Sequence, residues 1–170
     1  YRSNVSRYFF KAIKINENKS EYLYIKHYQN GECIKMENMY INHFAVFVCA
    51  ILCLVLGGLW YSPLLFYKGW KKENNFTDED LKKVNPAITY SFTFVFALIM
   101  SYNMAFFLGD AKTNMAWGAT AGFLAGFGWA ALIFAVIALF EGRSWKYILI
   151  NGGYITVYFT LIGLILGVWR

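Results

Sequence analysis

Four long apolar runs constrain this chain more than any other feature. They cover about residues 41–61, 88–108, 115–140 and 147–169, and none contains Lys, Arg, Asp or Glu. An α-helix rises about 1.5 Å per residue, so a run of about 20 residues crosses the roughly 30 Å hydrocarbon core of a bilayer. A backbone in lipid must satisfy its own hydrogen bonds, and a helix does this. The predicted fold class is therefore all-α: an integral membrane protein built as an antiparallel bundle of four transmembrane helices.

The composition supports a membrane protein and argues against a nucleic-acid-binding one. Of the 170 residues 58% are hydrophobic and 15% charged, whereas an average globular domain has roughly 25% charged residues. The net charge of +6 comes from residues outside the apolar runs, where basic side chains set membrane orientation. We expect the lipid bilayer as the main partner and no nucleic acid.

The distribution of basic residues predicts which side each connection occupies. Segment 62–87 has five Lys and segment 141–146 has one Arg and one Lys, whereas beyond Met36 the opposite side has only Lys112 and Arg170. Because basic connections stay in the cytoplasm, 62–87 and 141–146 are predicted to be cytoplasmic and both termini external.

Residues 1–35 differ from the rest, because they contain seven Lys or Arg and no run long enough to cross a membrane. We interpret 1–35 as an N-terminal extension and 36–170 as the four-helix transmembrane domain. The extension is either an arm that forms a short interfacial helix or a hairpin, or a segment upstream of the true start at Met36. If the extension is native, its basic residues oppose the predicted orientation.

The sequence offers few residues for catalysis or metal binding. Cys49 and Cys53 share one helical face without His or carboxylate neighbours, and His43 lies at a helix edge. The acidic segment 78–80 follows Thr77 as the capped first turn of a short helix. A Gly-rich phosphate loop, a His/Glu zinc motif and a nucleophile elbow are all missing from the sequence. We expect no catalytic residue, no metal, no cofactor and no enzymatic activity, with a membrane enzyme as the alternative.

Small residues recur at spacings that favour close helix packing. Such residues let two helix backbones approach each other, either within the chain or across a homo-oligomer. The predicted packing positions are Gly57, Gly58, Gly118, Gly122, Gly126, Gly163 and Gly167. Trp129 lies deep in the third run, so we expect its indole N–H to have a partner inside the protein.

Polar residues gather at the predicted cytoplasmic ends of the four runs. They are Tyr61, Ser62, Tyr90, Ser91, Glu141, Arg143, Asn151 and Tyr154. A bundle would bring them to one level as a polar collar. The collar either binds a small molecule or a lipid headgroup, mainly through Arg143, Glu141 and Asn151, or only satisfies the helix ends.

Several of these residues belong to recognisable motifs. They are Gly-Leu-Trp-Tyr-Ser-Pro-Leu-Leu-Phe at 58–66, an acidic helix start before Leu81-Lys82, Leu-Phe-Glu-Gly-Arg at 139–143 and Ile-Asn-Gly-Gly-Tyr at 150–154. With these motifs the chain resembles domain-of-unknown-function family 1761, small bacterial four-helix integral membrane proteins, over about residues 42–169. The resemblance implies the fold and a bacterial inner-membrane location but no activity. Ile155 stands where that family often has His, so no role for a His is carried over.

The function expected from these observations is that of a non-enzymatic membrane protein. It is a structural, partner-binding or small-ligand-binding module, and an unidentified membrane partner stays open. The alternative is a small oligomeric transporter or permeation subunit that acts on a small molecule or lipid headgroup. Ion-coupled carriers usually need charged residues inside the membrane, and the four apolar runs contain none.

Overall fold

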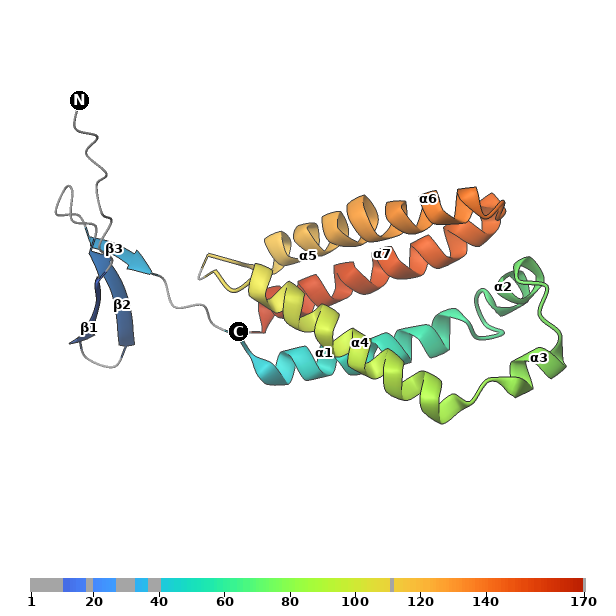
Figure 1. The fold of residues 1–170 in the computed structure, drawn as a ribbon, viewed down its shortest axis with the longest axis horizontal. Coiled ribbons are helices and arrows are strands. Elements are labelled where there is room, and N and C mark those ends of the chain that lie inside the picture. The colour runs from blue at the N-terminus through green and yellow to red at the C-terminus, as the bar shows by residue number, and fades with distance from the viewer. Residues whose placement is uncertain (1–10, 18–19, 27–32, 37–40, 111, 170) are drawn as a thin grey trace, which may run out of the picture. The chain divides into compact units, whose positions relative to one another are not determined.

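The computed structural model describes residues 11–17, 20–26, 33–36, 41–110 and 112–169, which belong to two separate units, 1–40 and 41–170. The first unit has strands β1 (Lys11–Glu17), β2 (Ser20–Lys26) and β3 (Cys33–Met36), paired antiparallel in the order β1-β2-β3 (Figure 1). Of the two conformations expected for this arm, the hairpin is therefore present, formed by β1 and β2 with Glu17 opposite Ser20. Whether the native chain starts at Met36 stays a prediction.

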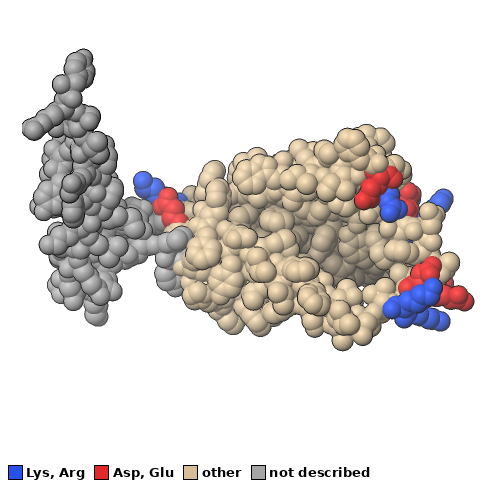
Figure 2. Space-filling view, viewed as in Figure 1, with Lys and Arg blue, Asp and Glu red and all other residues tan. Residues whose placement is uncertain are grey.

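The second unit consists of helices. They are α1 (His43–Trp60), α2 (Tyr67–Glu73), α3 (Asp78–Lys83), α4 (Pro86–Phe107), α5 (Met115–Phe123), the π-helix η1 (Leu124–Ala131), α6 (Leu132–Phe140) and α7 (Trp145–Val168). Among the described residues, four helical segments are long and apolar enough to cross a membrane: α1, α4, the continuous α5-η1-α6 and α7. The predicted four-helix transmembrane fold is confirmed. Figure 2 shows charged side chains only near the ends of the face of this unit that it presents, with an uncharged surface between them.

Each membrane helix begins at a residue whose side chain caps it. Asn42, Asn85, Asn114 and Ser144 accept hydrogen bonds from backbone N–H groups of the first turn. Such a cap contributes about 1 kcal/mol and satisfies donors that have no partner within the helix. The caps explain why α4 and α7 begin two residues before the limits predicted from hydropathy alone.

Helix α7 lies at the centre of the bundle. It contacts α5, η1 and α6 along one side and α1 and α4 along another, while α4 packs mainly against α1 (Figure 1). The core contains many small side chains, among them Ala45, Cys49 and Ala50 of α1 and Ala97 of α4. Large apolar side chains such as Phe140, 91% exposed, and Trp129, 73% exposed, lie on the outside. An apolar exterior suits a protein surrounded by lipid.

The third membrane helix contains a π-helical segment that hydropathy did not predict. Buried small residues follow its whole length: Gly118, Ala121, Gly122, Gly126, Ala131 and Ala138. A four-residue repeat drifts by about 40° per repeat around an ideal α-helix of 3.6 residues per turn. The wider turns of η1 reduce this drift and keep the small residues on the face that packs against α7. Trp129 instead points outward, and within the described structure its indole has no hydrogen-bond partner, so the expected internal partner was wrong.

Candidate functional site

The predicted glycine positions of the third and fourth membrane helices lie at close backbone contacts inside the chain. A Cβ added at Gly118 would lie 2.2 Å from the Gly163 carbonyl oxygen, and one at Gly167 would lie 2.7 Å from the Asn114 carbonyl oxygen. Gly122 and Gly126 face α7 at Phe159. The α5 and α7 small-residue faces are thus occupied by each other, and an oligomer through them would require these helices to separate.

The two glycines of α1 do not contact the backbone of another helix, unlike the glycines of α5 and α7. Gly57 lies beside the Tyr154 hydroxyl, which would be 3.5 Å from an added Cβ, whereas Gly58 has no neighbour within 4 Å of that point. Gly57 therefore leaves room for a side chain of α7 to approach the α1 backbone.

Three of the predicted collar residues meet between α1 and α7. Tyr61 donates a hydrogen bond from its hydroxyl to Asn151 Oδ1 at 2.9 Å, and Asn151 Nδ2 donates to the Tyr147 carbonyl oxygen at 2.9 Å. Tyr154 donates to the Cys53 carbonyl oxygen at 3.1 Å. We call Tyr61, Asn151 and Tyr154 the tyrosine cluster, and its bonds hold α1 against α7.

Ser62 ends α1. Its hydroxyl donates to the Leu59 carbonyl oxygen at 2.7 Å and accepts from the Leu64 N–H at 3.3 Å. Both bonds are local, so Ser62 shapes the turn after Tyr61 and does not contact the tyrosine cluster through them.

Glu141 and Arg143 lie in the turn between α6 and α7. Gly142 has φ +68°, and the N–H of Arg143 donates to the Ala138 carbonyl oxygen at 2.9 Å. This arrangement is a Schellman motif, which requires a left-handed residue and therefore favours Gly. It positions Arg143 with Nε 3.6 Å from Glu141 Oε2 and with its guanidinium 5.1 Å from the centre of the Tyr147 ring.

The end of α2 reaches this turn through Glu73. Its carboxylate accepts a hydrogen bond from the Ser144 hydroxyl and lies 4.0 Å from Lys146 Nζ. Ser144 also accepts from the Tyr147 N–H at 3.1 Å, so the carboxylate lies at the N-terminus of a membrane helix, where negative charge is favoured. The side chain of Glu73 is only 18% exposed. These bonds fix segment 62–87 to segment 141–146.

The two segments line a cavity of about 430 Å³, which we call the turn cavity. Its lining residues are Lys72, Glu73, Asn75, Glu141, Gly142, Arg143 and Ser144. Small-molecule sites typically measure about 300–1,000 Å³. Asn75 has φ +55°, a left-handed conformation that Asn tolerates better than most residues. The cavity combines two cationic and two anionic side chains.

Tyr90 and Ser91 do not join the other predicted collar residues. Both are exposed, Tyr90 by 60%, and in the part of the chain that the structure describes neither side chain makes a hydrogen bond. Helix α4 crosses α1, and its beginning diverges from α7 (Figure 1). Of the predicted collar, Tyr61, Asn151 and Tyr154 thus form the tyrosine cluster and Glu141 and Arg143 line the turn cavity, while Ser62, Tyr90 and Ser91 belong to neither. Sequence reasoning missed Lys72, Glu73, Asn75 and Ser144, although Glu73 stands out as an acid directly after two Lys residues.

Comparison with known proteins places the chain in a family. The family model for proteins of unknown function named DUF1761 matches residues 44–167. The chain belongs to the DUF1761 family. The match includes all four membrane helices except the first residue of α1 and the last of α7, and it includes the tyrosine cluster and the turn cavity, so the resemblance seen in the sequence motifs is confirmed. No curated protein and no solved structure matches the chain.

The acidic residues before Leu81 have a local structural role in this DUF1761 protein. Asp80 Oδ2 accepts from the Thr77 N–H at 3.1 Å, and the Asp80 N–H donates to Thr77 Oγ1 at 3.2 Å, which completes the predicted capping box of α3. Among the described residues, no group of three His, Cys, Asp or Glu side chains could hold a metal ion.

Proposed function

We propose that this DUF1761 protein is a non-enzymatic ligand-binding module of the bacterial cytoplasmic membrane and that the turn cavity is its binding site. The observation that carries the proposal is the meeting of two connections, 62–87 and 141–146, around a polar cavity of about 430 Å³. A connection that only joined helices would not need a partly buried carboxylate to fix it to its neighbour. The polar groups of the tyrosine cluster already have partners, since Tyr61 bonds to Asn151 and Tyr154 to Cys53, so they are less suited to bind a ligand.

The charges in the cavity favour a zwitterionic ligand. Arg143 and Lys72 suit an anionic group such as phosphate, and Glu141, 54% exposed, suits an ammonium group. The Glu141–Arg143 pair is long and exposed, so a ligand can replace it at little cost. The same chemistry occurs in a free small molecule and in a zwitterionic lipid headgroup, and the experiment must distinguish these sources.

Binding to purified protein in nanodiscs tests this proposal. One arm adds free glycerophosphoethanolamine to protein in phosphatidylcholine discs, and the other compares phosphatidylethanolamine with phosphatidylcholine as the disc lipid. In the arm that shows binding, Arg143→Gln should weaken it by about tenfold or more, because a hydrogen bond to a charged group contributes about 1.5–3 kcal/mol. Lys112→Gln, which makes the same charge change outside the cavity, should leave binding unchanged. Absence of binding in both arms, or an equal loss of binding in Arg143→Gln and Lys112→Gln, would contradict the proposal.

The proposal includes the orientation of the protein in the membrane, with the turn cavity on the cytoplasmic side. The seven basic residues in 62–87 and 141–146 support a cytoplasmic location for both segments and an external one for both ends of the chain. Cysteines introduced singly at Glu79, Gly142 and Lys112, in a background without the native cysteines, can be labelled with a membrane-impermeant maleimide. We expect labelling of intact cells at position 112 only. Labelling at 79 or 142 in intact cells would reverse the orientation.

A further inference from the structure

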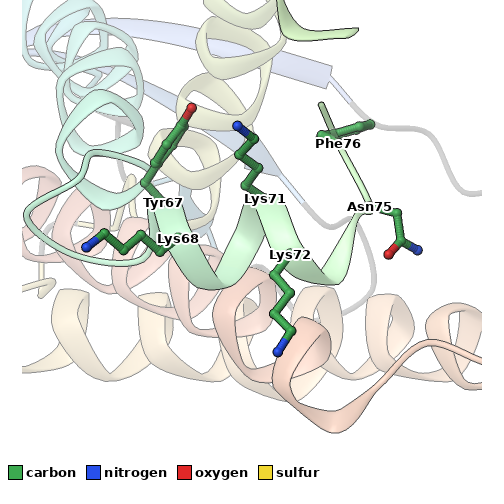
Figure 3. Close-up of a pocket in the computed structure, with 6 residues that line it drawn as sticks. All are labelled: Tyr67, Lys68, Lys71, Lys72, Asn75 and Phe76. Carbon is green, nitrogen blue, oxygen red and sulfur yellow. The ribbon is translucent and has the colours of Figure 1, made fainter. Parts of the chain in front are cut away.

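A second cavity, separate in its ligand chemistry from the turn cavity, lies against helix α2. It measures about 560 Å³ and is lined by Tyr67, Lys68, Lys71, Lys72, Asn75 and Phe76 (Figure 3). Its lining contains three Lys side chains and no carboxylate. The side chains of Tyr67 and Lys71 extend side by side from the same side of α2, while Lys68 and Lys72 extend in other directions (Figure 3). We call this surface the α2 lysine surface.

The position of α2 relative to the membrane helices is fixed by aromatic contacts. The Trp70 ring centre lies 5.5 Å from that of Tyr61, at the end of α1, and 5.4 Å from that of Phe76. Trp and Tyr rings prefer the headgroup level of a bilayer. Helix α2 therefore lies where α1 leaves the hydrocarbon core, and its Lys side chains are at headgroup depth.

Exposed apolar residues lie directly before the α2 lysine surface. Leu64 is 82% exposed, Leu65 49% and Phe66 37%, although all three follow the end of α1. In water, adjacent exposed apolar side chains would be unfavourable. Beside a lipid they can contact the upper parts of acyl chains, while the Lys residues contact the headgroup.

One Lys of the surface is held in place by an acidic neighbour. Lys71 pairs with Asp78, and this hydrogen bond raises the pKa of Lys71, so its ammonium group stays charged. Its Nζ lies 6.0 Å from the centre of the Tyr67 ring. Asp78 is 77% exposed and neutralises only one of the three cations. The surface therefore keeps an excess of positive charge.

From this combination we infer that the α2 lysine surface is a binding site for an anionic phospholipid, with the headgroup over α2, where Lys68 and Lys71 supply positive charge, and the acyl chains beside Leu64 and Leu65. Charge complementarity selects an anionic headgroup over a zwitterionic one. The adjoining apolar residues select a lipid over a free phosphate. Lys72 and Asn75 line both cavities, but Lys68 and Lys71 line only this one and Arg143 and Glu141 only the turn cavity, so variants of these residues test each proposal alone.

Lipid competition on the full chain tests the inference. The protein is exchanged into mixed micelles with equal amounts of phosphatidylglycerol and phosphatidylcholine, and retained lipids are counted by native mass spectrometry. We expect the wild type to retain phosphatidylglycerol preferentially. Lys68→Gln combined with Lys71→Gln should reduce that preference about 10- to 30-fold, because a Lys near an anionic surface contributes about 1 kcal/mol.

A matched control separates a site from general charge attraction. Lys82→Gln with Lys83→Gln removes the same two charges from α3, and it also removes one ion-paired Lys, because Lys83 bonds Asp80 at 3.0 Å. This double variant should keep the wild-type preference, as should Lys68→Arg with Lys71→Arg, which also shows that the surface still folds when its Lys residues are replaced. Equal losses in the two Gln double variants would overturn the inference. So would an unchanged preference in the α2 variant, or glycerol 3-phosphate displacing the bound lipid at equal concentration.

Discussion

The contact between α5 and α7 makes a quantitative prediction about Gly122. A methyl group at Gly122 would lie 2.2 Å from the Phe159 carbonyl oxygen and 3.0 Å from the Thr160 Cα. A comfortable C···O contact is about 3.3 Å, so the two helices would have to separate by roughly 1 Å. Both obstructing groups are backbone and cannot turn aside. Overpacking of this kind costs about 1–3 kcal/mol.

Helix propensity favours Ala over Gly and so opposes the overpacking cost, and a nearby glycine provides a control for this effect. Replacing Gly by Ala inside a helix is worth up to about 1 kcal/mol. Gly128 is in the same membrane segment, but an added Cβ there would have no neighbour within 4 Å. The propensity gain is common to both positions and cancels, so we expect Gly128→Ala to be neutral or stabilising and Gly122→Ala to be less stable than Gly128→Ala by about 1–3 kcal/mol in the free energy of unfolding.

Reversible unfolding by sodium dodecyl sulfate in mixed micelles, followed by far-UV circular dichroism, measures this difference. A gap of about 1–3 kcal/mol is roughly a 5- to 150-fold change in the unfolding equilibrium constant. If the two Ala variants unfolded alike, the backbone contact would not limit stability, and the central position of α7 against α5 would be refuted.

Three further predictions concern the tyrosine cluster, the α6–α7 turn and α3. Tyr154→Phe removes the hydrogen bond to the Cys53 carbonyl oxygen and should lower the unfolding free energy by about 0.6 kcal/mol, a typical value inside membranes, whereas Tyr90→Phe should have no effect. Gly142→Ala places a Cβ at φ +68° and should cost about 1–2 kcal/mol in the same assay, and equal stability would show that the turn tolerates another conformation. Hydrogen bonds from Thr77 and Lys83 lower the pKa of Asp80 below its ordinary value of 3.8. The ionised Asp80 should therefore stabilise α3 fully above pH 3.8, and this stabilisation should be lost as the pH falls through the lower pKa that Asp80 has in the folded protein. Carboxyl chemical shifts of Asp80 measure that midpoint, and a midpoint above 3.8 would contradict the capping box.

The sequence predicted the membrane helices well because lipid imposes a simple rule on length and polarity. The limits of α4 and α7 differed by two residues, since the caps at Asn85 and Ser144 lie outside the apolar runs. The π-helix was missed because hydropathy does not report the hydrogen-bond register.

The candidate site was harder to predict because it depends on contacts between distant segments. The sequence placed Tyr61 and Asn151 together correctly, because both lie near helix ends on the same predicted side of the membrane. The same argument placed Tyr90 there too, but equal depth does not make helix ends neighbours when α4 crosses α1. The bond between Glu73 and Ser144 joins residues 71 positions apart. Their types alone give no reason to pair them.

Cross-linking of Glu73 to Ser144 tests the central claim, that segments 62–87 and 141–146 meet on one side of the membrane, most directly. Glu73→Cys and Ser144→Cys are combined in a background without the native cysteines and oxidised in native membranes. Because the two side chains are in hydrogen-bond contact, we expect an intramolecular disulfide that changes gel mobility and disappears on reduction, and none between Lys112→Cys and Ser144→Cys. Absence of the 73–144 disulfide, or its formation only between separate chains, would contradict the site and the fold that builds it.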